Sequence, residues 1–209
     1  MPLFIKKALW IFPQGLFILR ILIILIYMIE KAKENYGVAR YFLLVMALSF
    51  IGWVFETVYM FVATGKFSDR GFLSLPFCPI YGCSIIAIYF LIDTPNKKSG
   101  AGKIKYLLLA FLIPSIAELL VGWIFDKGLN VRLWDYRGKA YNVCGYVCLR
   151  NSVAWSFLIY FFMRYMFLPI KNKIEDVPKT YANRLAFFLV MLITIDFSYN
   201  LARVIYLKA

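Results

Sequence analysis

Ionisable side chains gather near one segment, residues 131–145, of a chain that is otherwise mostly apolar. The hydrophobic run before this segment contains Glu118 and Asp126, while an earlier run contains Glu56 and is followed by Arg70. Arginine binds anionic groups through paired N–H donors, aromatic rings pack on apolar groups, and carboxylates take up a cation or a proton. These residue types predict a polar site for a small or amphipathic molecule. The candidate substrate-binding residues are Glu56, Tyr59, Arg70, Glu118, Asp126, Arg132, Trp134, Asp135, Tyr136 and Asn142.

Glu56 and Glu118 are the costly members of this set. Each lies about seven residues inside the end of a predicted apolar span, on the order of 10 Å deep. An ionised acid at the centre of a membrane costs roughly 2.5–3.5 kcal/mol, so both acids should face the protein interior and be paired, wetted or protonated. A buried Glu–Arg pair that only fixes packing is the alternative. We favour a functional site because the acidic and aromatic groups gather at one face.

The composition indicates the medium around these acids. The 209 residues are 63% hydrophobic with a mean hydropathy of +0.74, and the apolar residues form long blocks. Blocks of about 20 apolar residues match the thickness of a bilayer, and backbone groups inside a bilayer must be paired within the segment. The sequence therefore predicts an integral membrane protein built from helices.

The predicted fold class is all-α, a polytopic helical bundle of about six transmembrane helices that forms a single transmembrane domain over residues 1–209. The third span is short and begins in the motif Pro-Phe-Cys-Pro, so we expect a tilted, broken or partly re-entrant segment. The six expected spans are residues 8–29, 40–64, 77–92, 104–125, 143–168 and 185–207.

Two five-residue motifs suggest an internal repeat. Gly-Trp-Val-Phe-Glu at residues 52–56 is answered by Gly-Trp-Ile-Phe-Asp at residues 122–126, and a polar loop and a cysteine-bearing helix entry follow each copy. We interpret residues 40–92 and 104–168 as two helix hairpins related as a parallel repeat. Such a repeat would place both polar loops on the same membrane face.

The charge pattern bears on orientation and partners. The net charge is +13, and Lys and Arg are frequent in the loops after the first, third and fifth spans. This bias favours those loops in the cytoplasm and both termini outside it, in a multi-pass membrane protein. Cytoplasmic loops that face anionic membrane lipids explain the charge better than nucleic acid does, because no basic segment is interleaved with aromatic residues.

Several chemistries are absent from the sequence. The chain has no histidine, which excludes histidine bases and histidine metal ligands. Its four cysteines occur as C-x4-C and C-x3-C rather than with zinc-site spacing, so we expect no metal and no cofactor. We expect free thiols, with a Cys78–Cys144 disulfide as the alternative to test first. The chain also lacks a phosphate-binding loop, so any ATP-driven step requires a separate ATPase subunit.

Five stretches between residues 49 and 155 carry a family resemblance: GWVFETVY, DRGFLSLPFCPIYG, AELLVGWIFD, RLWDY and YNVCGYVCLRNSVAW. They resemble the signature of the CmpB-like ABC-transporter type IV family of bacterial permease-like membrane proteins. The resemblance implies transport by a multi-pass protein of the bacterial cytoplasmic (inner) membrane. It places the family's polar positions on Glu56, Arg70, Glu118, Asp126, Arg132, Trp134, Asp135, Tyr136 and Asn142.

Three functions fit these observations. The leading one is a transporter, permease-like or substrate-capture protein with a polar pocket near the non-cytoplasmic face. Its partners would be membrane lipids and either a separate ATPase subunit or further copies of itself. The second is a membrane-embedded enzyme acting on a lipid or lipid-linked substrate, with Glu118 or Asp135 as general base. The third is a non-catalytic assembly or regulatory protein whose polar cluster only locks the fold.

Overall fold

The structure is a computed structural model that describes residues 37–67, 71–95 and 100–206. The predicted first span and Arg70 lie outside these residues. The described part is mostly helical, as predicted, with one short antiparallel β-ladder that the sequence analysis did not predict. Its elements are α3 (Val38–Thr64), α4 (Pro79–Ile92), α5 (Gly100–Gly128), β1 (Asn142–Val143), β2 (Val147–Cys148), α6 (Leu149–Tyr165), α7 (Phe167–Glu175) and α8 (Lys179–Tyr206).

Three of the described helices are long and apolar enough to span a membrane. The qualifying segments are Val38–Val62 in α3, Gly102–Gly128 in α5 and Lys179–Tyr206 in α8. Helices α6 and α7 together would make a fourth span, bent by 51° at the break between them. Helix α4 has 14 residues and is shorter than a simple span. The predicted bundle of six transmembrane helices and its internal repeat stay predictions.

Local sequence explains where these helices begin and end. Helix α3 stops at Gly65, which adopts a left-handed conformation (φ 68°) and donates its N–H to the carbonyl of Phe61. Helix α4 begins at Pro79, because proline suits the first turn of a helix. Helix α6 begins at Leu149 rather than at the predicted residue 143. The intervening residues pair as β1 and β2, so the prediction was wrong at that boundary.

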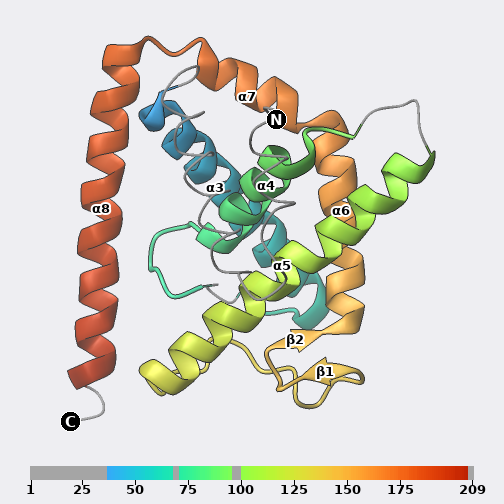
Figure 1. Cartoon of the computed structure of the whole chain (residues 1–209). Helices are drawn as coiled ribbons and strands as arrows, with labels where there is room; N and C mark the ends of the chain where they lie inside the picture. Colours follow the sequence, from blue (N-terminus) through green and yellow to red (C-terminus); the bar gives the residue numbers. More distant parts are fainter. Residues whose placement is uncertain (1–36, 68–70, 96–99, 207–209) are drawn as a thin grey trace, which may run out of the picture.

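The core lies where α3, α4, α5, α6 and α7 meet, with α5 crossing the other helices at a slant (Figure 1). Gly82 allows α4 to approach α3 closely, since a Cβ there would lie 2.3 Å from the backbone oxygen of Val45. The completely buried members of the core are Leu44, Ile88, Ala110 and Phe167. Many large apolar side chains on α3, α5 and α8 remain exposed, which is the pattern of helices that face lipid.

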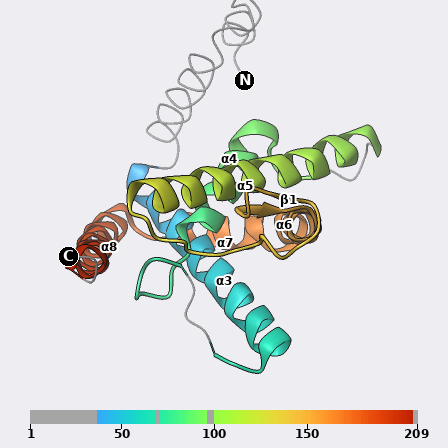
Figure 2. The ribbon, with the colours of Figure 1, turned by 90° about the horizontal axis from the view of Figure 1, so that it is seen from below.

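Helix α8 stands at one side of the molecule, and Figure 2 shows it almost end-on from below. It packs on α3 through Ala182 and Ala186. Further along α8, the Asp196 carboxylate accepts the backbone N–H of Ser74 at 2.9 Å and that of Leu75 at 3.3 Å. These bonds fasten the loop between α3 and α4. The β-hairpin lies at the bottom of the view in Figure 1, beneath α5.

Candidate functional site

Arg132 is the centre of a polar cluster just after α5. Its guanidinium donates to Asp135 at 3.1 Å, to Asp126 at 3.5 Å and to the backbone carbonyl of Cys144 at 3.3 Å. The same group lies over the ring of Tyr146, 5.0 Å from the ring centroid. Arg132 therefore joins the end of α5 to the loop and to the hairpin.

Asp135 and Arg137 form a two-pronged ion pair beside Arg132. The Arg137 Nε and Nη2 atoms donate to the carboxylate at 2.9 and 2.6 Å, and the Arg137 backbone N–H donates to it at 3.0 Å. These Arg137 bonds hold the pKa of the Asp135 carboxyl well below its usual range. Asp135 is therefore ionised at neutral pH and forms ion pairs with both Arg132 and Arg137.

The hairpin supports this cluster through its turn. Gly145 has a φ of 73°, a left-handed conformation that favours glycine, and its Cα lies beneath the side chains of Arg132, Asp135 and Arg137. The Asn142 side chain accepts the Gly145 N–H at 2.9 Å and donates to the Lys139 carbonyl at 2.8 Å. Asn142 thus shapes the turn rather than facing the open cavity.

The two Gly-Trp-x-Phe-acid motifs make the same contact with a tyrosine. In the second copy, the ring of Tyr146 lies against Gly122, and its hydroxyl donates to Asp126, one helical turn further along α5. In the first copy, the ring of Tyr81 lies against Gly52, and its hydroxyl donates to Glu56 at 2.8 Å. Each glycine leaves room for the ring, and each acid four residues later receives the phenol hydrogen.

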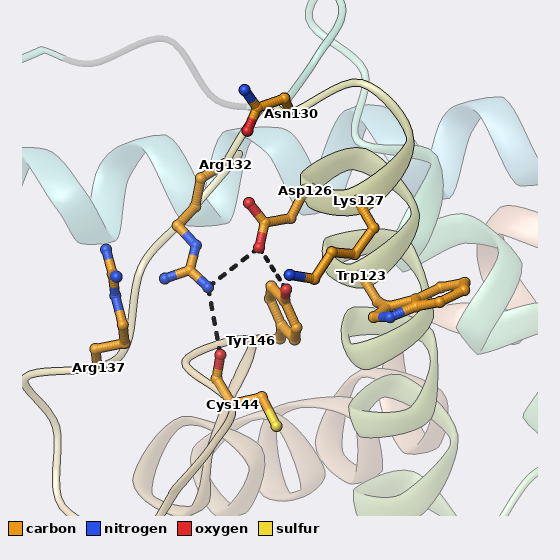
Figure 3. A pocket seen from close by; sticks show the side chains of 8 residues that line it. All are labelled: Trp123, Asp126, Lys127, Asn130, Arg132, Arg137, Cys144 and Tyr146. Carbon is orange, nitrogen blue, oxygen red and sulfur yellow. Dashed lines mark hydrogen bonds and ion pairs between the residues drawn. The ribbon is translucent and has the colours of Figure 1, made fainter.

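A cavity of about 680 Å³ opens at the end of α5 (Figure 3), and we call it the outer cavity. Three of its lining side chains are cationic, and one is a carboxylate. The carboxylate Asp126 lies between the Arg132 guanidinium and the Tyr146 hydroxyl, while Lys127 forms no ion pair with any described residue. The lining residues are Trp123, Asp126, Lys127, Asn130, Arg132, Arg137, Cys144 and Tyr146.

A second polar group lies deeper, at the contact of α3, α4 and α5. Glu118 is 9% exposed, and its Oε2 atom has no hydrogen-bond partner among the described residues. Glu56 acts electrostatically on Glu118, and both acids act on Tyr136, so these three groups are neighbours. Burial raises the pKa of the Tyr136 phenol to about 12, and the charge of Glu118 adds to the effect. The Tyr136 side chain therefore reaches from the loop toward Glu56 and Glu118, which we call the inner acids.

A family profile, described as "Putative ABC-transporter type IV", matches residues 41–201. That match covers most of the chain. The chain belongs to the putative ABC-transporter type IV family. No curated protein and no solved structure matches it. The family and the three apolar helices together make it a membrane protein.

In this member of the type IV family, the predicted binding residues fall into two groups. Asp126 and Arg132 line the outer cavity. Asp135 and Asn142 do not line it, but they hydrogen-bond to Arg132 and to the Gly145 turn, respectively. Trp134 also supports the hairpin, because its indole N–H donates to the Tyr146 carbonyl at 2.7 Å.

Glu56, Glu118 and Tyr136 form the inner group instead. Tyr59 joins neither group through a hydrogen bond within the described residues, and its side chain is 53% exposed on α3. Arg70 lies outside the described residues. One shared cavity for all ten predicted residues is therefore not what the structure shows.

Sequence reasoning missed several residues of this type IV family member, and two of them had a readable signal. Tyr81 and Tyr146 both stand a few residues after a cysteine that follows a Gly-Trp motif, in the strings Cys-Pro-Ile-Tyr and Cys-Gly-Tyr. Comparing the two strings would have singled out the tyrosines. Lys127 had no such signal, because a lysine at the end of an apolar helix is expected on packing grounds alone.

Proposed function

We propose that the chain is a substrate-capture or permease component of a membrane transport system, and that its outer cavity binds an amphipathic anion. The observation that carries this proposal is the cavity of about 680 Å³ with three cationic side chains at the end of α5. Even when Asp126 and Asp135 are both counted, the cluster keeps a surplus of one positive charge. A ligand with one anionic group would balance that surplus.

The cavity also offers apolar surface next to its charges. Trp123 lines it with a half-exposed indole, and Tyr146 contributes a ring beneath the Arg132 guanidinium. Lys127 is free of ion pairs within the described residues, so a ligand can pair with it without breaking a bond of the protein. An anion joined to a ring or a short acyl chain would use both parts of this lining.

The place of the cavity in the membrane follows from the charge bias of the loops. The preferred orientation puts the hairpin end near the non-cytoplasmic face of a multi-pass protein in the bacterial inner membrane. A separate ATPase subunit would meet the opposite end, because the chain itself has no nucleotide-binding motif. Membrane lipids would cover the exposed apolar faces of α3, α5 and α8.

The two rival functions receive less support from the geometry. An enzyme acting on a lipid would need a free base beside the cavity, but Asp135 is held by two arginines and Glu118 does not line the cavity. Formation of product from a labelled lipid by the purified chain would favour that rival. A purely structural cluster would leave function unchanged in variants that keep the fold.

Thermal unfolding of the purified chain tests the capture proposal with three probes: phenyl phosphate, phenol and inorganic phosphate. We expect phenyl phosphate to stabilise the chain most, because it offers an anion and a ring together. At a concentration about 100 times its Kd, a ligand stabilises the folded state by about 2.7 kcal/mol. No stabilisation by phenyl phosphate, or equal stabilisation by phenol, would contradict the proposal.

Lys127→Gln is the most informative variant, since it removes a cavity cation that has no ion pair within the described residues. It should fold normally and lose most of the stabilisation by phenyl phosphate. Lys66→Gln is the matched control, because Lys66 is an exposed lysine beyond the end of α3 and does not line the cavity. This control should respond like the unchanged chain.

A further inference from the structure

The inner acids, Glu56 and Glu118, come from two long helices and lie within electrostatic range of each other. Glu56 lies on α3 and Glu118 on α5, and the charge of each acts on Tyr81 and Tyr136. Neither acid lines the outer cavity. The charge of Glu56 acts on Glu118, and two carboxylates that interact in a medium of low dielectric constant repel each other, so ionising both is unfavourable.

The two acids differ sharply in their hydrogen bonds. Glu56 accepts the Tyr81 hydroxyl at 2.8 Å, and the thiol of Cys78 lies 3.8 Å from the same oxygen. Glu118 is nine-tenths buried, and its Oε2 atom has no partner within the described residues. Donors stabilise a carboxylate, whereas an unpaired buried oxygen strongly disfavours one. The negative charge therefore belongs on Glu56, and Glu118 is the acid that lacks compensation.

Among the described residues, the groups that act on the pair are tyrosine, cysteine and asparagine side chains, which supply no positive charge. Tyr81 and Cys78 face it from α4 and its entry, and Tyr136 faces it from the loop after α5. Cys148 at the end of β2 and Asn151 in the first turn of α6 lie next to Tyr136, and the Asn151 side chain hydrogen-bonds to it. No described lysine or arginine forms an ion pair with either acid. Within the part of the chain that the structure describes, the pair therefore has no compensating cation, and the smallest ligand that supplies a positive charge is a proton.

We propose that Glu56 and Glu118 form a proton-binding site in which the pair carries one negative charge and Glu118 holds the proton. The unpartnered, buried Oε2 atom of Glu118 is the observation that points to a ligand at this place. Glu118 would then be a group inside the membrane that changes its charge when it releases or takes up a proton, as a proton-coupled transport step requires. It is distinct from anion capture, because none of its residues line the outer cavity.

Infrared spectroscopy of the full chain in lipid tests this site directly, because a protonated carboxyl has a C=O band separate from that of a carboxylate. At pH 7 we expect a carboxylic-acid band that disappears in Glu118→Gln. Glu175→Gln is the control, since Glu175 is an exposed acid paired with Lys171, and this variant should keep the band. A band that is absent at pH 7, or unchanged in Glu118→Gln, would overturn the proposal.

A second variant keeps the test decisive if Glu118→Gln folds poorly. Glu56→Gln removes the neighbouring charge and leaves Glu118 in place, so the Glu118 proton should be released at a lower pH. We expect the midpoint of the acid band to fall by about one pH unit or more, a tenfold change in proton affinity. An unchanged midpoint would overturn the pairing of the two acids. A carboxylate band that shifts when Na⁺ replaces K⁺, with no acid band, would overturn the proton in favour of a metal cation.

Discussion

Tyr81 donates its hydroxyl hydrogen to Glu56 at 2.8 Å, and this bond joins α4 to α3 inside the segment that is apolar enough to cross a membrane. Tyr146 makes the corresponding bond to Asp126 at the end of α5. In both places a glycine four residues before the acid receives the tyrosine ring. The same local device therefore serves an inner acid in one copy and a cavity acid in the other.

Removing the two hydroxyls should have unequal effects. Tyr81→Phe leaves Glu56 with only the weak thiol contact of Cys78 among the described hydrogen bonds, and a bond to a charged group contributes about 1.5–3 kcal/mol. Tyr146→Phe should cost less, because Arg132 still reaches Asp126. Thermal unfolding of the purified variants measures the difference. A greater loss for Tyr146→Phe would contradict this assignment.

The two glycines that lie against the tyrosine rings should tolerate an added methyl group less well where less space is available. A Cβ at Gly52 would lie 2.6 Å from the Tyr81 ring, whereas one at Gly122 would lie 3.0 Å from the Tyr146 ring. Overpacking of this kind costs about 1–3 kcal/mol, so Gly52→Ala should lower the melting temperature more than Gly122→Ala. Gly128→Ala is the control, because no atom lies within 4 Å of its Cβ position. Equal stability of all three variants would contradict the packing described.

Protonation of Asp135 at low pH should destabilise the loop between α5 and β1. Because its pKa is lowered in the folded chain, Asp135 contributes stability that is present above its ordinary pKa of about 3.9. That contribution is lost as the pH falls from there toward the folded-state value. Trp134, whose indole bonds to the hairpin, should report the change in its fluorescence. Asp135→Asn should remove this acid transition, and a transition of the same size in the variant would assign it to another group.

Gly145 should control the shape of the outer cluster. Alanine at its φ of 73° is strained by about 1–2 kcal/mol, and its Cβ would lie 2.6 Å from Arg137 Cγ. We expect Gly145→Ala to displace Arg137 and to weaken phenyl phosphate binding. Gly138→Ala, in the same loop with open space around it, is the matched control for binding by titration. Normal binding by Gly145→Ala would show that the cavity does not depend on this turn.

Sequence reasoning predicted the long helices well, because runs of apolar residues fix where a chain can cross a bilayer. The predicted span at 40–64 lies within α3, and the one at 104–125 lies within α5. The β-ladder was missed because its strands have two residues each, too few for an alternating pattern. The predicted helix start at residue 143 failed for the same reason.

The sequence could single out the residue types of the candidate site, but it could not give their arrangement, and their role in binding stays a prediction. Charge and burial rules singled out Glu118 and Arg132 from their residue types alone. The separation into an outer cavity and an inner acid pair depends on distances between helices, which a single sequence does not contain. Asp135 shows most clearly what sequence alone does not reveal. Its residue type suggests a general base, but in the structure it forms ion pairs with Arg132 and Arg137.

Isothermal titration of the purified chain with phenyl phosphate is the most direct measurement of the central proposal, anion capture by the outer cavity. The account predicts one saturable site whose Kd rises about tenfold or more in Lys127→Gln and stays unchanged in Lys66→Gln. A tenfold change corresponds to about 1.4 kcal/mol, a reasonable loss for one cation–anion contact. Equal affinity of the unchanged chain and Lys127→Gln, or no saturable binding at all, would contradict the account.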